Sequence, residues 1–223
     1  MAGKKLKVII TGATGMVGEG VMIQCLQHAD VEAVLIINRK ASGYNHPKLT
    51  EIVHTDFYNL MPIEDQLVGY DACYFCLGIS SVGVSRDDYY KTTYMITLGV
   101  AQTLAALNTD MTFCYVSGAG TDSKEKGTGW AAVKGKTEND LMKLPFKQVF
   151  AFRPGFIKPI EGQTRVNKLF KFIAWMYPIG RSLYSGGFAQ VREIAEAMIK
   201  VTRDGYAKPV IEGKDIIALG KTA

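Results

Sequence analysis

Residues 11–18 of the chain read TGATGMVG, which places three glycines at a Gly-x-x-Gly-x-x-Gly spacing. An apolar run at residues 6–10 precedes them, and a helix-like segment at residues 15–28 follows. A buried strand, a glycine-rich turn and a helix in this order are typical of a dinucleotide phosphate cradle, because the free N–H groups and the dipole of the helix favour an anion. The stretch therefore predicts an α/β nucleotide-binding fold. A purely structural turn is the alternative, since loops collect glycines for their geometry.

The three glycines have separate expected roles. Gly12 allows the tight turn, Gly15 lets the backbone approach a pyrophosphate, and Gly18 lets the helix pack closely on the strand. The residues between them share the turn and the start of the helix and are also predicted to contact the cofactor: Thr14, Met16 and Val17.

Length and composition restrict the class of protein. A chain of 223 residues suits one α/β domain spanning residues 1–223. The net charge of +5 comes without a dense Lys/Arg run, which argues against nucleic acid as a partner. We find no signal-peptide pattern and no apolar stretch of membrane-spanning length, so we expect a cytoplasmic protein without an integral membrane segment. No metal site is predicted.

Apolar, β-branched runs alternate with helical patterns along the chain. The predicted strands are residues 7–11, 33–38, 51–54, 71–77, 112–117 and 148–153, with a short seventh at 209–211. The predicted helices lie near residues 15–28, 86–107, 130–143, 165–177 and 189–203. This order predicts a single doubly wound Rossmann-like domain with a mostly parallel sheet of six to seven strands.

The doubly wound order makes the first and fourth strands neighbours. A ligand should then lie across their carboxyl ends, between Gly12 and Gly78, with Leu77 beside it. Residues 79–90 follow the fourth strand and are expected to border the pocket of a small-molecule substrate. Ser85 and Asp88 in this segment fit a helix cap better than a ligand contact.

The end of the second strand indicates which dinucleotide is bound. It reads Asn38-Arg39-Lys40, with two cations and no carboxylate. An acidic residue here binds ribose hydroxyls and repels a 2′-phosphate, whereas an arginine accepts the phosphate. We therefore favour NADP, with Arg39 as its ligand; NAD and a merely solvated loop stay open. Asp56 is predicted to accept from the adenine amino group, and Phe57 to flank the ring.

These features together resemble the short-chain dehydrogenase/reductase superfamily over essentially the whole chain. The residues that carry the resemblance are Thr11-Gly12-x-x-Gly15-x-x-Gly18, Asp56, Gly78, Ser117, Lys134 and Arg153-Pro154-Gly155. It is strongest with the atypical branch, near the NAD-dependent epimerase/dehydratase-like proteins, and within it with the group that contains the human HIV Tat-interacting protein. The resemblance implies that Pro154 and Gly155 also contact the cofactor.

The superfamily's catalytic set is a serine, a tyrosine and a lysine, with the tyrosine four residues before the lysine. The resemblance assigns Ser117 and Lys134 to the serine and the lysine, and Trp130 occupies the tyrosine position. It also implies that the Lys134 ammonium binds the nicotinamide ribose of the cofactor. An indole N–H donates a hydrogen bond but does not titrate, so it cannot transfer a proton. The resemblance thus implies a dinucleotide-binding protein whose usual dehydrogenase activity is reduced or lost. A strand-end serine and a solvated lysine are the structural alternatives for Ser117 and Lys134.

Two other functions stay open. The chain could be an active NADPH-dependent reductase or isomerase that acts on a small carbonyl compound or a quinone by a tyrosine-free mechanism. It could instead be an adaptor that binds a partner protein or a membrane surface through the apolar helix predicted at residues 166–177. Usually such a helix is core or a lid over the substrate. Assembly into a homodimer is left open.

Overall fold

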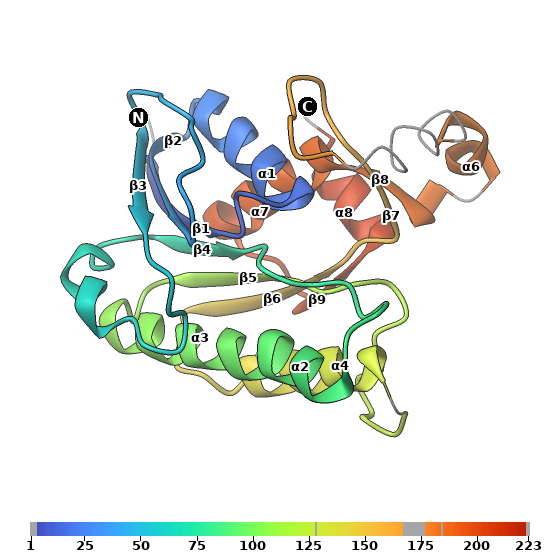
Figure 1. Cartoon of the computed structure of the whole chain (residues 1–223). Helices are drawn as coiled ribbons and strands as arrows, with labels where there is room; N and C mark the ends of the chain where they lie inside the picture. The colour runs from blue at the N-terminus through green and yellow to red at the C-terminus, as the bar shows by residue number, and fades with distance from the viewer. Residues whose placement is uncertain (1–3, 128, 167–176, 184, 222–223) are drawn as a thin grey trace.

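The computed structural model describes residues 4–127, 129–166, 177–183 and 185–221 (Figure 1). Seven strands form one sheet in the order β3-β2-β1-β4-β5-β6-β9, and every neighbouring pair is parallel. Their bounds are β1 Leu6–Thr11, β2 Val31–Asn38, β3 Leu49–Val53, β4 Ala72–Phe75, β5 Thr112–Val116, β6 Gln148–Arg153 and β9 Val210–Glu212. The predicted α/β fold with its parallel sheet is confirmed, as is the pairing of the first and fourth strands.

Helices cover both faces of this sheet (Figure 1). The upper face in the figure carries α1 (Met16–Gln27), α7 (Val191–Asp204) and α8 (Gly213–Leu219). The lower face carries α3 (Ile96–Leu107) and α4 (Trp130–Leu141). The short helix α2 (Arg86–Tyr90) continues through a π-helical turn, η2 (Lys91–Met95), into α3. Shorter helical segments are η1 (Met61–Gln66), α6 (Tyr177–Leu183) and η4 (Ser185–Gly187).

The two faces of the sheet bury two separate hydrophobic clusters. Val8 and Ile10 of β1 pack in the cluster with α1 and α7, whereas Ile9 between them packs in the cluster with α3. All three side chains are fully buried. Successive side chains of a strand point to opposite faces, so a strand covered on both sides is apolar along most of its length. This is why the central strands could be recognised as continuous apolar runs.

Some elements differ from the prediction. The helix expected near residues 86–107 is α2, the π-helical turn and α3 in succession. The chain also forms α8 and a small second sheet of two parallel strands, β7 (Phe156–Lys158) and β8 (Phe188–Gln190), none of which was predicted. Strands of three residues are too short to show a hydrophobic period.

The apolar helix predicted near residues 165–177 falls largely outside the described residues, at 167–176. Its last predicted residue, Tyr177, begins α6. Over the described ranges, no helix is both long enough and apolar enough to span a bilayer.

Candidate functional site

The glycine turn joins the end of β1 to the start of α1, and two of its glycines leave no room for a side chain. Gly12 has φ +73°, and a Cβ there would lie 2.7 Å from the backbone of Cys76 and Leu77. A Cβ on Gly18 would lie 2.2 Å from the carbonyl oxygen of Gly12. The turn therefore packs directly on the chain that leaves β4 and on the first turn of α1, which is the close packing expected of these two positions.

The start of α1 offers backbone donors. Gly15 is its N-cap, has no capping side-chain hydrogen bond, and donates its own N–H to the Gly12 carbonyl at 2.9 Å. Met16, Val17 and Gly18 form the first turn, where N–H groups have no partner within the helix. These groups and the positive end of the helix dipole suit a phosphate.

A cavity of about 230 Å³ lies beside this turn. It collects residues from the carboxyl ends of β1, β2 and β4, as the parallel topology requires. The residues that line it are Gly12, Thr14, Gly15, Ile37, Asn38, Arg39, Phe57, Cys76, Leu77 and Gly78. Seven of the predicted cofactor residues thus meet at one cavity, and Arg39 is the charged residue among them.

Asp56 lies apart from this lining. Its side chain is exposed, and Oδ1 accepts a hydrogen bond from the backbone N–H of Tyr58 at 2.9 Å. Phe57, the next residue, is buried and lines the cavity. Asp56 therefore shapes the turn that places Phe57, and its predicted contact with adenine stays a prediction.

Asn38 ends β2 and is 2% exposed. Its Nδ2 donates to Oε1 of Glu51 at 2.9 Å, while its Oδ1 has no hydrogen-bond partner within the described part of the chain. Sequence reasoning missed Glu51, because nothing in a strand's hydrophobic pattern reveals a polar partner on the neighbouring strand.

Ser117 follows β5 and is held within its own loop. Its N–H donates to the Phe152 carbonyl at 2.8 Å, and its Oγ lies 3.0 Å from Oγ1 of Thr121. The side chain is buried. A buried hydroxyl with a fixed partner has a defined position, whether its role is structural or chemical.

Trp130 and Lys134 begin α4, and their spacing puts them on one helical face. The Lys134 ammonium donates to the Val116 carbonyl at 3.3 Å and lies 5.2 Å from the centre of the Tyr115 ring. Burial lowers the pKa of Lys134 to about 8, while the Glu138 carboxylate acts in the opposite direction. The Lys134 side chain is thus half-buried and packed under the end of β5.

The pKa of Lys134 leads to a prediction for stability. Because the folded-state pKa is about 8 and the ordinary value is 10.5, the unfolded chain binds this proton more tightly. The contribution of Lys134 to the free energy of unfolding therefore rises as the pH increases from about 8 to 10.5. We expect the melting temperature of the wild type, relative to that of Lys134→Met, to increase from pH 8 to pH 10.5. A difference that does not change with pH would contradict the burial of the charged group.

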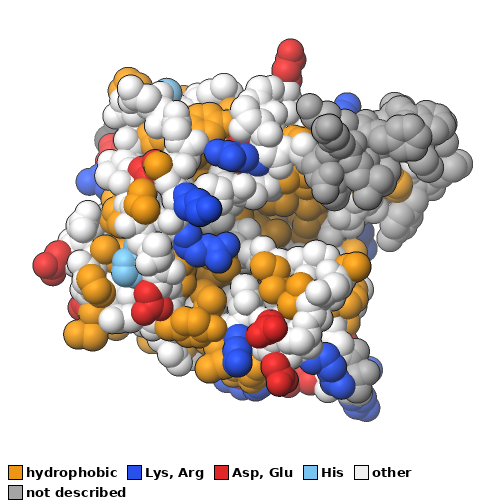
Figure 2. Space-filling view, in the orientation of Figure 1, with side chains coloured by type: hydrophobic (Ala, Val, Ile, Leu, Met, Phe, Trp, Pro, Cys, Tyr) orange, Lys and Arg blue, Asp and Glu red, His pale blue; other side chains and the backbone are white. Residues whose placement is uncertain are grey.

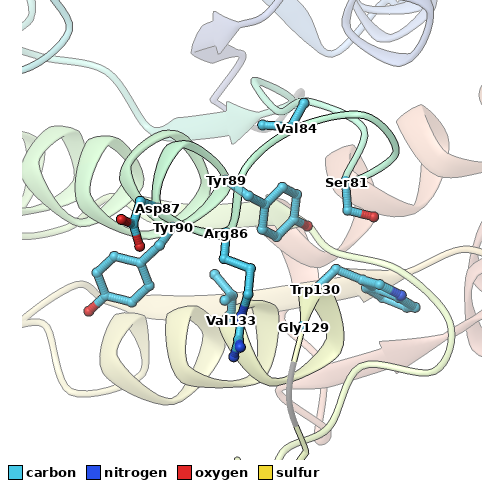
Figure 3. A pocket seen from close by; sticks show the side chains of 9 residues that line it. All are labelled: Ser81, Val84, Arg86, Asp87, Tyr89, Tyr90, Gly129, Trp130 and Val133. Carbon is cyan, nitrogen blue, oxygen red and sulfur yellow. The ribbon is translucent and has the colours of Figure 1, made fainter.

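Trp130 lies at the edge of a second cavity, of about 530 Å³ (Figure 3). Trp130 is 38% exposed, and its ring reaches over the loop after β5, where a Cβ on Gly120 would be 3.6 Å from it. Figure 3 shows Ser81, Tyr89 and Trp130 around the same part of the cavity. The residues that line it are Ser81, Val84, Arg86, Asp87, Tyr89, Tyr90, Gly129, Trp130 and Val133. As expected, part of segment 79–90 borders a cavity.

The cap predicted in that segment is confirmed. Ser85 is the N-cap of α2, and its Oγ accepts from the N–H of Asp88 at 3.1 Å and donates to Oδ2 of Asp88 at 2.7 Å. The two polar side chains are therefore engaged with each other.

Pro154 and Gly155 follow β6, next to the loop that carries Ser117. The Pro154 carbonyl accepts from the N–H of Ala119 at 2.9 Å, and a Cβ on Gly155 would lie 2.5 Å from the Gly187 carbonyl. Gly155 borders a further cavity of about 770 Å³. A backbone hydrogen bond thus connects the loops that follow β5 and β6. This is consistent with two adjacent strands that end at one site.

Arg153, the last residue of β6, forms a buried ion pair with Glu138 of α4. Its Nε donates to Oε1 at 3.0 Å, and its Nη2 donates to Oε2. The Glu138 side chain is 2% exposed and that of Arg153 10%. The pair fastens α4, which carries Trp130 and Lys134, to the sheet. Sequence reasoning missed it because a helix carboxylate gives no local sign of a partner on a distant strand.

The architecture and the glycine turn define a nucleotide-binding Rossmann protein of the atypical short-chain dehydrogenase/reductase type. The family model of the NAD dependent epimerase/dehydratase family matches residues 8–137, and the chain belongs to that family.

The chain is similar over almost its whole length to the protein named fmp52, mitochondrial, from Aspergillus fumigatus, with 25% identity over 96% of this chain and 97% of the relative. Among solved structures, it resembles a UDP-N-acetylglucosamine 4-epimerase from Methanobrevibacter ruminantium, with a TM-score of 0.67, 20% identity, and coverage of 94% of this chain and 76% of the other. A short chain dehydrogenase family protein from Francisella tularensis gives a TM-score of 0.61 at 17% identity, covering 90% and 92%. At these identities the solved structures establish the fold.

Proposed function

We propose that the chain binds NADP(H), in preference to NAD(H), in the cavity at the carboxyl ends of β1, β2 and β4. The observation that carries this preference is the charge of the lining: Arg39 directly follows β2, and the described residues that line the cavity include no Asp or Glu. Lys and Arg side chains also gather near the middle of the face shown in Figure 2. An anionic ligand with a 2′-phosphate suits this environment.

The residues present fit such a dinucleotide. The uncapped start of α1 provides donors for a pyrophosphate, Arg39 suits a 2′-phosphate, and Phe57 offers an apolar wall for adenine. The Oδ1 of Asn38, which has no partner among the residues that the structure describes, supplies a buried acceptor beside them. Asp56, Ser117, Lys134, Pro154 and Gly155 keep their predicted roles in this proposal. When bound, the cofactor supplies or accepts a hydride.

Replacing Arg39 by alanine is expected to weaken NADPH binding about 10- to 100-fold and to leave NADH binding nearly unchanged. The physical reason is the loss of a charge-assisted hydrogen bond to the one group that distinguishes the two dinucleotides. Isothermal titration calorimetry at constant ionic strength measures both affinities.

Lys40→Ala is the matched control, because Lys40 is the adjacent exposed cation and is not among the residues that line the cavity. If Arg39→Ala lost affinity equally for NADPH and NADH, the assignment of Arg39 to the 2′-phosphate would be contradicted. Failure of the wild type to bind NADPH would overturn the proposed function.

We further propose that the usual tyrosine-based dehydrogenase chemistry is reduced or lost in this chain. Trp130 stands one helical turn before Lys134, where the superfamily carries its tyrosine, and an indole does not titrate. A second candidate function is a tyrosine-free NADPH-dependent reductase or isomerase for a small carbonyl compound or a quinone. The cavity beside Trp130, with the hydroxyls of Ser81 and Tyr89 at it, favours this candidate.

The two candidates differ in turnover. The second predicts oxidation of NADPH in the presence of a panel of carbonyl compounds and quinones, with loss of activity in Ser117→Ala and retention in Trp130→Phe. Equal activity in these variants and in Lys134→Met would place the reaction elsewhere. No turnover with any compound of the panel favours the first candidate, a protein that binds the cofactor without reducing a substrate.

A single domain over residues 1–223 and a cytoplasmic location are retained as proposals. The relatives from Aspergillus carry the word mitochondrial in their names, so the location needs its own experiment. Cell fractionation with cytoplasmic and mitochondrial marker enzymes decides between the two compartments. Light scattering tests the homodimer that the sequence leaves open.

A further inference from the structure

The carboxylate of Glu51 connects the end of β2 with the loop that follows it. Glu51 lies on β3, beside β2 in the sheet. Its Oε1 accepts from Nδ2 of Asn38 at 2.9 Å and from the N–H of Ser42 at 2.8 Å. Its Oε2 accepts from Oγ of Ser42 at 3.1 Å. The segment held between these two contacts, residues 39–41, includes Arg39.

The same contact fixes which way the Asn38 amide faces. An ionised carboxylate only accepts hydrogen bonds, so the amide must present its NH₂ group to Glu51, and Oδ1 must face away from it. Asn38 is 2% exposed and lines the cavity at the glycine turn, and its Oδ1 has no partner within the described ranges. A buried acceptor without a donor is unfavourable, and most buried polar groups have partners. A ligand hydroxyl would satisfy it.

The position of Asn38 indicates which part of the ligand is concerned. The residue at the end of the second strand of this fold meets the adenosine ribose, and an acidic residue there binds the ribose hydroxyls. An amide oxygen accepts the same hydrogen bond without placing a negative charge beside a 2′-phosphate. Here the carboxylate stands one strand away, on Glu51, and is engaged by Asn38 and Ser42.

We propose that Glu51 is a positioning residue for the adenosine end of the cofactor. It turns Oδ1 of Asn38 toward a ribose hydroxyl, and it holds the segment that carries Arg39 in reach of the 2′-phosphate. This inference rests on the proposed function and adds a specificity-determining residue that does not itself touch the 2′-phosphate.

The test is a double-mutant cycle on the full chain, read by calorimetric titration with NADPH and with NADH. Glu51→Gln and Asn38→Ala are each expected to weaken the binding of NADPH and of NADH about tenfold, because both dinucleotides carry the ribose hydroxyl. For NADH, the double variant should bind no more weakly than either single variant, since Glu51 acts there through Asn38. For NADPH, Glu51→Gln should weaken binding more than Asn38→Ala does, because it also releases the segment that carries Arg39. The preference of the protein for NADPH over NADH should therefore decrease.

Glu32→Gln is the matched control. It removes one carboxylate charge from β2 at an exposed position, where Oε1 is 3.8 Å from Nζ of Lys7. The melting temperature of each variant separates loss of binding from loss of fold. If Glu51→Gln does not fold, Asn38→Ala and Ser42→Ala carry the test, because each removes only one side-chain partner of the carboxylate.

The outcomes distinguish this inference from the proposed function. If the wild type binds NADPH and Glu51→Gln binds both dinucleotides as tightly as the wild type, the positioning role is wrong and NADP binding stands. Fully additive losses for NADH would also overturn it, because Glu51 would then act independently of Asn38. If the wild type binds neither dinucleotide, the positioning role of Glu51 and the proposed function are both wrong.

Discussion

Replacing Trp130 by tyrosine is expected to raise the rate of NADPH-dependent reduction of a small carbonyl compound about 10²- to 10⁴-fold, the range typical of a positioned general acid. The substitution places a titratable hydroxyl one helical turn before Lys134. The ammonium of Lys134 is half-buried, so its charge is screened less than on the surface and should lower the pKa of a neighbouring phenol. The rate is measured as the decrease in NADPH absorbance over the carbonyl panel.

Trp130→Phe controls for the change in ring size, because phenylalanine has the tyrosine ring without the hydroxyl, and it should show no gain. The double variant Trp130→Tyr with Lys134→Met should lose the gain, since the charge that activates the phenol is gone. If Trp130→Tyr is no faster than Trp130→Phe, the missing tyrosine does not limit NADPH-dependent reduction by this chain.

Replacing Glu138 by alanine is expected to lower the free energy of unfolding by about 3–5 kcal/mol, the usual effect of removing one partner of a buried ion pair. Glu138 and Arg153 are among the most buried charged side chains described, with exposures of 2% and 10%. The substitution leaves the guanidinium with the hydroxyl of Ser123 and with the carboxylate of Glu212, at 3.2 Å, whose side chain is 46% exposed. Urea unfolding followed by circular dichroism measures the change.

Glu161→Ala provides the comparison, because Glu161 is an exposed carboxylate and its removal should change stability by less than about 0.5 kcal/mol. Since Glu138 holds α4 against β6, its loss should also disturb Lys134 and weaken cofactor binding. A decrease below about 1 kcal/mol for Glu138→Ala would show that this pair does not fasten α4 to the sheet.

The parts of the fold that the sequence predicted are those governed by local pattern. Central parallel strands are apolar along most of their length, and the Gly12–Gly18 turn lies directly between such a strand and a helix, so β1, α1 and their neighbours could be placed in advance. The π-helical turn at Lys91–Met95 and the small sheet of β7 and β8 could not, because each depends on packing and is too short for a hydrophobic period.

The candidate site divides in the same way. Arg39, Phe57 and Leu77 were predicted to meet because parallel strand ends lie at one edge of a sheet, and they do line one cavity. The polar pairs Asn38–Glu51 and Arg153–Glu138 were missed, since each joins residues on different elements. Such pairs become visible only when the register of strands and the packing of helices are known.

The same contrast separates binding from catalysis. Family membership rests on the match over residues 8–137, which begins with the strand and the glycine turn of the proposed cofactor site. The proposed loss of tyrosine-based chemistry concerns the side chain at residue 130, which is an indole in this chain. Fold and family therefore support a cofactor, and the residues at the site must decide the chemistry.

The most direct test of the account is a crystal structure of the chain with NADPH. We expect the pyrophosphate at the N–H groups of Met16 and Val17, the 2′-phosphate on the Arg39 guanidinium, and Trp130 facing the nicotinamide C4. A 2′-phosphate directed away from Arg39, or a dinucleotide bound outside the cavity at the glycine turn, would contradict it.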